Sequence, residues 1–401
     1  MTTMKKDRKD KVNVPNLRFP KFEEEWEWYS IEKIANLSKG SGISKDQLSE
    51  NGHPCILYGE LYTKYKSEII QEILSKTDIA SNSLVKSVAN DVIIPSSGES
   101  AIDIATARCV PFSNILLGGD LNIIRLKSDN GSFLSYQLNG VRKYDIAKVA
   151  QGVSVVHLYG ESLKKIQVSI CSEKEQEKIA NFLSLLDERI ATQNKIIEKL
   201  ESLIKGISQM LFKKKYHWIE YYISDIATVV CGGTPDTTDS SFWNGKIQWF
   251  TPSEIGKEKY VTTSKRTITE LGLNHSGARL LPANTILLST RATIGECSIA
   301  MEECATNQGV QSLTANNVDY EFLYYLISTK KNELLRRSSG STFSEISANE
   351  LRKMKVIVPP FKEQQKIANI LKTIDLKISI ERKILNQCKK QKDSLLERMF
   401  I

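Results

Sequence analysis

The sequence has few of the residues that usually build metal centres. It contains four histidines, and no two of its seven cysteines form a CxxC pair, so no metal site is expected. It has no apolar run of 18 or more residues, so no membrane-spanning helix is expected. The basic N-terminus is followed by no apolar segment of the kind found in secretion signals. We therefore expect a cytoplasmic protein with reduced cysteines.

The motifs of common nucleic-acid enzymes and nucleotide-binding proteins are also missing. There is no N-P-P-[FY] tetrapeptide, no G-x-x-x-x-G-K-[ST] loop and no G-x-S-x-G elbow. Gly40–Lys45 has its glycines and lysine in the wrong order for a phosphate-binding loop. Asp91 and Glu99 resemble a nuclease pair, but no lysine follows Glu99 at the usual spacing. We predict that the chain has no catalytic residues, binds no cofactor and is not an enzyme.

The positive charge is unevenly distributed along the chain. The formal net charge is +8, but residues 17–173 carry −2 and residues 216–361 carry −1. The excess lies in residues 1–16, 213–215 and 362–401. A protein that binds DNA unaided usually has a strongly basic face. Charge alone therefore does not establish DNA binding, and it suggests that another subunit supplies some phosphate contacts.

The sequence contains an internal repeat. Residues Lys174–Ile196 align without a gap to Lys362–Ile384, at an offset of 188 residues. Upstream, Tyr29–Ala35 resembles Tyr221–Ala227. Each half is therefore a variable globular module of about 150 residues followed by one long helix. We predict a basic tail over residues 1–16, globular domains over 17–173 and 216–361, and helices over 174–215 and 362–401.

Both helical segments carry apolar residues at alternating spacings of four and three, which is typical of a coiled coil. Each segment of roughly 39 residues would be about 58 Å long. We expect the two helices to pair with each other, with homodimerisation as the alternative. The predicted seam consists of Ile179, Leu183, Leu186, Ile190, Gln193, Ile197 and Leu200 in the first helix and Ile367, Leu371, Ile374, Ile378, Glu381 and Leu385 in the second.

The polar seam residues predict the direction of the pairing. Gln193 lies at the midpoint of the first helix, and Glu381 occupies the equivalent position in the second. In an antiparallel pair, only midpoint residues meet their own equivalents. We therefore predict antiparallel helices in which Gln193 and Glu381 approach each other, unless both are merely tolerated at a wet position. Lys392 is expected to weaken the second seam, although its stem can cover apolar surface.

The globular modules have the short β-branched runs and polar loops of mixed α/β domains. The predicted fold is α+β, with two mixed α/β domains separated by two long antiparallel coiled-coil helices and related by an internal pseudo-two-fold repeat. Strands are predicted at Val92–Ile94, Asn122–Leu126, Thr285–Leu288 and Val356–Val358, and short helices at Phe133–Gly140 and Phe322–Ser328.

The end of the second module resembles the signature of Type I restriction-modification specificity subunits. The first module carries a degraded copy, with Ile170-Cys171 near the place of Pro359-Pro360. The opening of the first module, Asn16–Trp26, and the segment Leu287–Gly295 within the second module also resemble this family. The matching residues are Gly340-Ser341-Thr342, Ile346-Ser347, Leu351, Val356, Val358-Pro359-Pro360, Glu363-Gln364 and Ile367, and in the first copy Gly152, Ser154, Leu163, Val168, Glu175-Gln176 and Ile179.

This resemblance implies two target-recognition domains, each reading one half of an interrupted site in double-stranded DNA. It also implies that the helices dock two methyltransferase subunits, and that restriction subunits join the complex. S-adenosylmethionine and ATP are then expected on the partner subunits. The alternative is a coiled-coil scaffold whose globular ends bind proteins.

Base recognition needs side chains that reach base edges. Arg291 is the preferred candidate because it follows a β-run in a loop rich in serine and threonine. A solvated surface role is the alternative for every candidate. Trp243 and Trp249 are expected to pack in a core rather than stack on a base. The DNA-binding candidates are Lys64, Lys66, Lys86, Arg108, Arg142 and Lys143 in the first module and Lys257, Lys259, Lys265, Arg266, Arg279 and Arg291 in the second.

Overall fold

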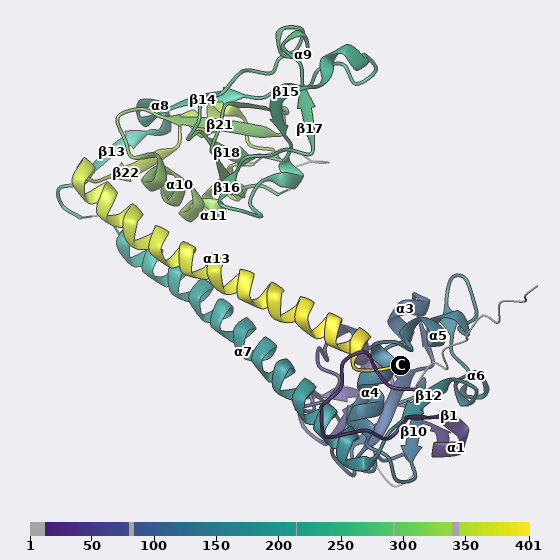
Figure 1. Ribbon diagram of the computed structural model, residues 1–401. Helices are drawn as coiled ribbons and strands as arrows, with labels where there is room; N and C mark the ends of the chain where they lie inside the picture. Colours follow the sequence, from purple (N-terminus) through teal and green to yellow (C-terminus); the bar gives the residue numbers. More distant parts are fainter. Residues whose placement is uncertain (1–12, 80–83, 214, 292, 339–344) are drawn as a thin grey trace, which may run out of the picture. The chain divides into compact units, whose positions relative to one another are not determined.

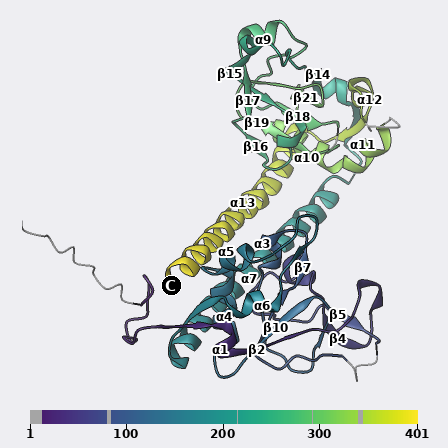
Figure 2. The same cartoon turned by 90° about the vertical axis from the view of Figure 1, so that its right-hand side faces the viewer.

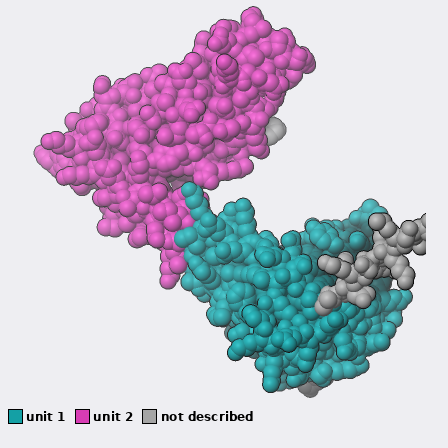
Figure 3. All heavy atoms as spheres, viewed as in Figure 1, with its two compact units in different colours: residues 1–195, 383–401 teal, residues 196–382 magenta. Residues whose placement is uncertain are grey.

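The chain folds into two compact units, as a computed structural model shows (Figure 3). Unit 1 comprises residues 1–195 and 383–401, and unit 2 comprises residues 196–382. Each unit contains one globular domain and parts of two long helices, α7 (Glu173–Leu211) and α13 (Phe361–Arg398) (Figure 1). The described residues are 13–79, 84–213, 215–291, 293–338 and 345–401, so the signature residues Gly340, Ser341 and Thr342 lie outside them.

The domain of unit 1 is built on a four-stranded antiparallel sheet in the order β2-β10-β6-β8. Strand β6 (Asp91–Pro95) contains the predicted run Val92–Ile94, and β10 (Leu121–Leu126) contains the whole of Asn122–Leu126. Both strands are buried on both faces, which explains why their sequences are nearly continuous apolar runs. The strand predictions are confirmed.

The two faces of this sheet belong to different cores. Val92, Ile94 and Ile124 pack with helices of the domain, whereas Ile93 and Ile123 pack with a second, four-stranded sheet, β3-β5-β4-β9. Figure 2 shows β4 and β5 of this second sheet. The remaining elements of unit 1 are β1 (Glu27–Ser30), α1 (Ile31–Ile34), β2 (Ala35–Lys39), β3 (Leu48–Ser49), β4 (His53–Ile56), α2 (Glu60–Thr63), β5 (Ser75–Thr77), β7 (Ser97–Gly98), α3 (Ala101–Ile104), β8 (Arg108–Val110), β9 (Leu116–Leu117), α4 (Gly131–Asn139), α5 (Lys143–Lys148), β11 (Val156–His157), α6 (Gly160–Lys164) and β12 (Gln167–Ile170).

Unit 2 repeats this order of elements. Its main sheet has the order β14-β21-β18-β19-β16, in which the first four strands correspond to β2-β10-β6-β8. A second, three-stranded sheet has the order β17-β15-β20. Its elements are β13 (Ile219–Tyr222), α8 (Ile223–Ile226), β14 (Ala227–Cys231), β15 (Trp243–Phe250), β16 (Tyr260–Val261), β17 (Arg266–Ile268), α9 (Glu270–Asn274), β18 (Ile286–Ser289), β19 (Cys297–Ala300), β20 (Cys304–Thr306), β21 (Val310–Ala315), α10 (Tyr320–Thr329), α11 (Lys331–Arg337), α12 (Ala348–Arg352) and β22 (Lys355–Val358).

The other sequence-predicted elements are also present. The runs Thr285–Leu288 and Val356–Val358 coincide with β18 and β22, and the two predicted short helices coincide with α4 and α10. In each domain the first strand pairs antiparallel with the last, β1 with β12 and β13 with β22. This pairing brings the start of each domain next to the start of the helix that follows it.

The long helices run antiparallel. In unit 1, Ile179 and Leu183 near the start of α7 share a core with Leu396 near the end of α13. In unit 2, Ile204 near the end of α7 packs against the core that holds Ile367 near the start of α13. Opposite ends therefore meet in both units, which confirms the predicted direction. No helix of the described residues is both long and apolar enough to cross a membrane.

All thirteen predicted seam residues are buried or half-buried. The polar midpoint residues are included, since Gln193 is 7% exposed and Glu381 is 6% exposed. A salt bridge of 2.5 Å joins the Glu381 carboxylate to Lys377 one turn earlier. The approach of Gln193 to Glu381 would join the two units, and it stays a prediction.

The repeated Glu-Gln pair at the start of each helix fastens it to its domain. Glu175 accepts hydrogen bonds from Arg18 at 2.7 and 2.8 Å and from the Trp26 indole at 3.2 Å. Gln176 accepts one from the Asn130 backbone N–H, at the N-cap of α4, at 2.8 Å. The sequence repeat is therefore, in part, a repeat of docking contacts.

The second copy makes equivalent contacts, with Lys215 and His217 in the place of Arg18. Glu363 accepts hydrogen bonds from Lys215, His217 and the Trp218 indole. Those from Lys215 and His217 lower the pKa of Glu363 to about 2. Gln364 accepts one from the Asp319 backbone N–H, at the N-cap of α10, at 2.9 Å.

Candidate nucleic-acid interface

Three polar loops of unit 1 meet beside the ends of its two sheets. They are residues 40–44 after β2, residues 58–64 around α2, and residues 118–120 between β9 and β10. A Cβ atom on Gly40 would lie 2.0 Å from the Gly118 carbonyl oxygen, so only glycine permits this approach of two loops. The backbone N–H to carbonyl bonds here are Gly40 to Leu121 (3.0 Å), Ser41 to Leu117 (3.0 Å), Gly118 to Ile56 (2.9 Å) and Ser96 to Asp120 (2.7 Å).

Unit 2 has the same loops joined by the same hydrogen bonds. They are residues 231–234 at the end of β14, 251–255 after β15 and 307–309 between β20 and β21. A Cβ atom on Gly232, the counterpart of Gly40, would lie 2.2 Å from the Asn307 carbonyl oxygen. The corresponding bonds are Gly232 to Val310 (3.2 Å), Gly233 to Thr306 (2.8 Å), Asn307 to Phe250 (3.0 Å) and Thr290 to Gly309 (2.9 Å).

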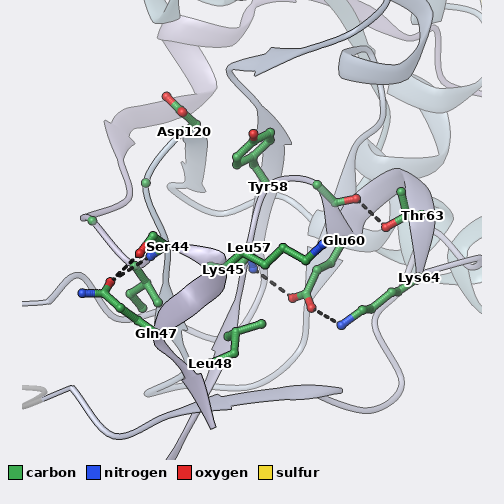
Figure 4. Close-up of a pocket in the computed structure, with 14 residues that line it drawn as sticks. Ser44, Lys45, Gln47, Leu48, Leu57, Tyr58, Glu60, Thr63, Lys64 and Asp120 are labelled. Carbon is green, nitrogen blue, oxygen red and sulfur yellow. Dashed lines mark hydrogen bonds and ion pairs between the residues drawn. The ribbon is translucent and has the colours of Figure 1, made fainter.

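In unit 1 the three loops line a cavity of about 770 Å³ (Figure 4). Its polar side chains include Lys45 and Lys64, which are balanced by Glu60 and Asp120. Glu60 is buried and accepts hydrogen bonds from the Leu57 backbone N–H at 3.0 Å and from Lys64 at 2.6 Å. The cavity is thus formally neutral, and it offers hydrogen-bonding groups rather than a concentration of positive charge.

In unit 2 the preferred candidate, Arg291, lies beside the equivalent loops. It follows β18, and its Cδ is 3.6 Å from the place where a Cβ on Gly309 would be. Its guanidinium forms a salt bridge of 2.9 Å with Glu345, and the side chain is 44% exposed. Nearby, Thr234 donates a hydrogen bond to the Gln308 side chain. Arg291 is therefore accessible and held by an ion pair at the surface of unit 2.

Arg108, a DNA-binding candidate of the sequence analysis, is buried inside unit 1. The residue is 8% exposed, and its guanidinium donates to the backbone carbonyls of Leu61 at 3.1 Å and Tyr65 at 2.9 Å. These bonds tie β8 to the segment around α2. Arg108 is therefore a buried structural residue that does not reach the surface, and that candidacy is corrected.

Lys259 is likewise engaged inside unit 2. Its ammonium forms a salt bridge of 2.7 Å with Glu321 and donates to the Tyr325 hydroxyl at 2.6 Å. Arg142 lies over the Trp28 ring at 4.6 Å, and it also pairs with Asp145. Neither Lys259 nor Arg142 belongs to the three-loop surface.

The remaining candidates have partly or fully exposed side chains. Lys143 is half-buried, and burial together with nearby Arg108 lowers its pKa. Arg266 is stacked 3.4 Å from the Trp243 ring centroid. Trp243 and Trp249 are buried and form an edge-to-face pair with centroids 5.2 Å apart, which confirms their core role. Exposed residues are Lys66, Lys86, Lys257, Lys265, Arg266 and Arg279.

The three-loop surfaces also contain residues that were not among the sequence candidates, because no local pattern in the sequence indicates that these separate loops meet. The available signal was the glycines, at Gly40 and Gly118 in unit 1 and at Gly232 and Gly309 in unit 2. These mark places where loops approach closely. The missed residues are Lys45, Gln47, Asp120, Thr234 and Gln308.

No cluster of three metal-ligating side chains occurs among the described residues. Asp91, which resembled one half of a nuclease pair, is buried and accepts hydrogen bonds from Arg125 at 2.9 and 2.7 Å. All seven cysteines are free thiols, and Cys231 is exposed.

The chain has recognisable relatives among known proteins. Residues 23–202 and 216–390 each match the family described as the Type I restriction modification DNA specificity domain. The chain belongs to this family. It is a specificity subunit with two copies of the domain, and the boundaries of the copies follow the internal repeat.

Two relatives come from Methanocaldococcus jannaschii. The Type I restriction enzyme MjaIX specificity subunit is 36% identical over 46% of this chain and 42% of the relative. The chain thus matches less than half the length of that relative. The putative type I restriction enzyme MjaX specificity subunit is 24% identical over 94% of this chain and 93% of its own length.

Solved structures show the same fold. The S subunit of a Type I restriction-modification system from M. genitalium superposes with a TM-score of 0.65 at 18% identity. The match covers 97% of this chain and 99% of that subunit. A second structure, from work on complex assembly and conformational transition of the type I R-M system, has a TM-score of 0.59 at 14% identity, over 93% and 97% of the chains.

Proposed function

We propose that this specificity subunit recognises a bipartite site in double-stranded DNA, one half-site per domain, and that it catalyses no reaction itself. The observation that carries the proposal is the repeated three-loop surface. Its backbone hydrogen bonds are the same in both units, while its side chains differ. A constant scaffold with variable side chains is suited to reading two unrelated base sequences.

The side chains on these surfaces suit base recognition. Arg291 carries the donor fork that pairs with guanine, and Gln47 and Gln308 carry the amide that pairs with adenine. The domains themselves are close to neutral. We infer that partner subunits provide much of the salt-dependent phosphate binding.

The helix pair offers a docking surface for the methyltransferase subunits. In unit 1, α7 and α13 form a groove of about 690 Å³ with an apolar floor and a basic rim. Phe182 is 40% exposed and Leu185 is 63% exposed there, so the groove presents two neighbouring large apolar side chains that a partner could cover. The rim includes Arg189, Lys390 and Arg398.

On this proposal the enzymatic steps take place on other chains. Two methyltransferase subunits would bind S-adenosylmethionine, and restriction subunits would bind ATP. The complex would assemble in the cytoplasm, where chromosomal DNA is accessible. A coiled-coil scaffold with protein-binding ends is the competing function, and it requires no DNA specificity.

Mapping methylated sites tests the proposal. The subunit is co-expressed with its methyltransferase, and methylated positions are mapped in the host DNA. We expect an interrupted site, and exchange of residues 217–360 for those of another family member should change one block only. Arg291→Ala should reduce discrimination at a base of that block by about tenfold, since one bidentate contact is worth about 1–3 kcal/mol.

The matched control is Arg336→Ala. This arginine is exposed in the same unit, and its side chain donates to the carbonyl of Asn332 in its own helix. It should leave the methylated sequence unchanged. A continuous site, methylation that ignores the exchanged domain, or methylation by the purified chain alone would refute the proposal.

A further inference from the structure

A cluster of buried charges joins the helices of unit 1 to its domain. Lys392 of α13 forms salt bridges with Glu68 of the domain and with Asp187 of α7, the latter at 2.5 Å. The three side chains are only 11%, 8% and 6% exposed, respectively. Lys392, which was expected to weaken the seam, is thus a specific contact between three segments.

Hydrogen bonds from the domain complete the cluster. The Tyr136 hydroxyl of α4 donates to Asp187 at 2.7 Å, and the Ser67 hydroxyl donates to the same oxygen at 3.0 Å. Burial and the Asp187 carboxylate raise the pKa of Tyr136, so this hydroxyl remains a donor. Asp187 is therefore held from α13 and from two parts of the domain.

Unit 2 has a corresponding cluster. Asp375, the repeat equivalent of Asp187, accepts a hydrogen bond from Tyr325 of α10. Lys259 lies 3.6 Å from Asp375 and 2.7 Å from Glu321. Lys372 of α13 also pairs with Glu321, at 2.9 Å. The same groups, an aspartate, a tyrosine, a glutamate and a lysine, thus join helix to domain in both units.

Such clusters constrain geometry in a way that apolar packing does not. Apolar side chains tolerate small rotations and shifts, because one apolar contact replaces another at similar free energy. A buried ion pair is stable only when the charges and hydrogen bonds meet, so displacement leaves a charge unpaired in a poorly solvated place. The best-attested role of buried polar groups is to select one register or orientation.

We propose that these two clusters narrow the range of spacer lengths that the subunit accepts between its two half-sites. The inference rests on the proposed bipartite recognition. Each cluster fixes the orientation of one domain on the helix segments of its own unit. A domain free to turn on its helices would bind its half-site over a wider range of spacer lengths. Asp187, Tyr136 and Lys392 are then positioning residues that touch no DNA.

The experiment uses the full subunit co-purified with its methyltransferase. The site with its native spacer is first established, and duplexes are then prepared with spacers one base pair shorter and longer. The main variant is the neutral triple Glu68→Gln, Asp187→Asn and Lys392→Met, which preserves volume and removes the charges. Replacing a buried ion cluster by uncharged groups often preserves stability, so this variant is expected to fold.

The readout is the ratio of methylation rates on the native and altered spacers. We expect the triple variant to lower this ratio by about tenfold or more, while the bases required in each half-site stay the same. Asp187→Asn alone should lower it less, because Lys392 keeps Glu68 as a partner. Lys389→Met, an exposed lysine on the same helix, is the control and should leave the ratio unchanged.

An unaltered spacer ratio in the folded triple variant would overturn the inference. If the triple variant does not fold, an unaltered ratio in Asp187→Asn has the same meaning. These outcomes are distinct from failure of the proposed function, in which the unmodified complex would show no interrupted site at all. A loss of half-site discrimination equal to the loss of spacer discrimination would also count against it, since that indicates general loosening.

Discussion

The two charge clusters are built from the same groups, but the lysine comes from different places. In unit 1 it is Lys392 of the last helix, whereas in unit 2 Lys259 of the domain bridges the two acids and Lys372 of the last helix pairs with Glu321 as well. The residue of α7 that is repeat-equivalent to Lys392 is Ile204. The unit 1 aspartate is 6% exposed, compared with 28% for Asp375. The repeat has thus kept the two carboxylates and the tyrosine of each cluster while changing which segments supply the lysines.

The largest expected effect distinguishes the two lysines by stability. Lys392→Met leaves Glu68 and Asp187 buried together without their ammonium partner, which should cost about 3–5 kcal/mol. Lys259→Met should cost about 1–2 kcal/mol, in the usual range for a point substitution. The cost is smaller because Lys372 still pairs with Glu321 and because Asp375 is more exposed. Urea unfolding of the two variants measures the difference. Equal losses would show that the two clusters are energetically alike.

An intermediate effect concerns the pH dependence of stability at the start of α13. The folded-state pKa of Glu363 lies at about 2, below its ordinary value of 4.5. A carboxyl group whose pKa is lower in the folded chain than in the unfolded chain stabilises the fold at pH values above its unfolded-state pKa. This stabilisation is lost as the pH falls from about 4.5 towards 2. Glu363→Gln should therefore flatten the acid limb of the stability curve over this window. Thermal melts from pH 6 to pH 2 would show this smaller loss of stability. If the melting temperature of the variant falls with pH in parallel with that of the unmodified chain, the lowered pKa of Glu363 is contradicted.

The smallest effect uses the cysteines to test the three-loop surface of unit 2 separately from that of unit 1. Cys231 is exposed at the end of β14 and belongs to the three-loop surface of unit 2. By contrast, burial raises the pKa of Cys109 to about 11 and of Cys297 to about 12, so these thiols should react slowly. A bulky maleimide should attach first to Cys231 and weaken recognition of the second half-site alone. Mass spectrometry of the labelled chain and methylation of half-site mutants provide the readouts. Cys231→Ser should abolish both effects.

The elements that a continuous stretch of sequence encodes could be predicted. The long helices were predictable because the apolar spacing persists through both copies, and β6 and β10 because their β-branched runs are buried on both faces. The antiparallel direction also followed from sequence, through the polar midpoint residues.

The roles of single charged residues were not predictable in this way. Arg108 and Lys259 looked like surface cations, yet both are held inside their units by partners distant in sequence. Lys392 pairs with a carboxylate 324 residues away. No local pattern distinguishes a lysine that will find such a partner from one that remains in water. The three-loop surfaces escaped notice for a similar reason, since separate loops assemble them.

The different origin of the two lysines bears on how new specificities can arise by recombination between genes of this family. A gene segment encoding the second domain carries Lys259, Glu321 and Tyr325 together, so it brings both the cation and the acid for its own cluster. A segment encoding the first domain brings Glu68 and Tyr136 but depends on a lysine encoded near the end of the recipient gene. The second domain is therefore the more portable half, and transfers of the first should succeed mainly between genes that share this distant lysine codon.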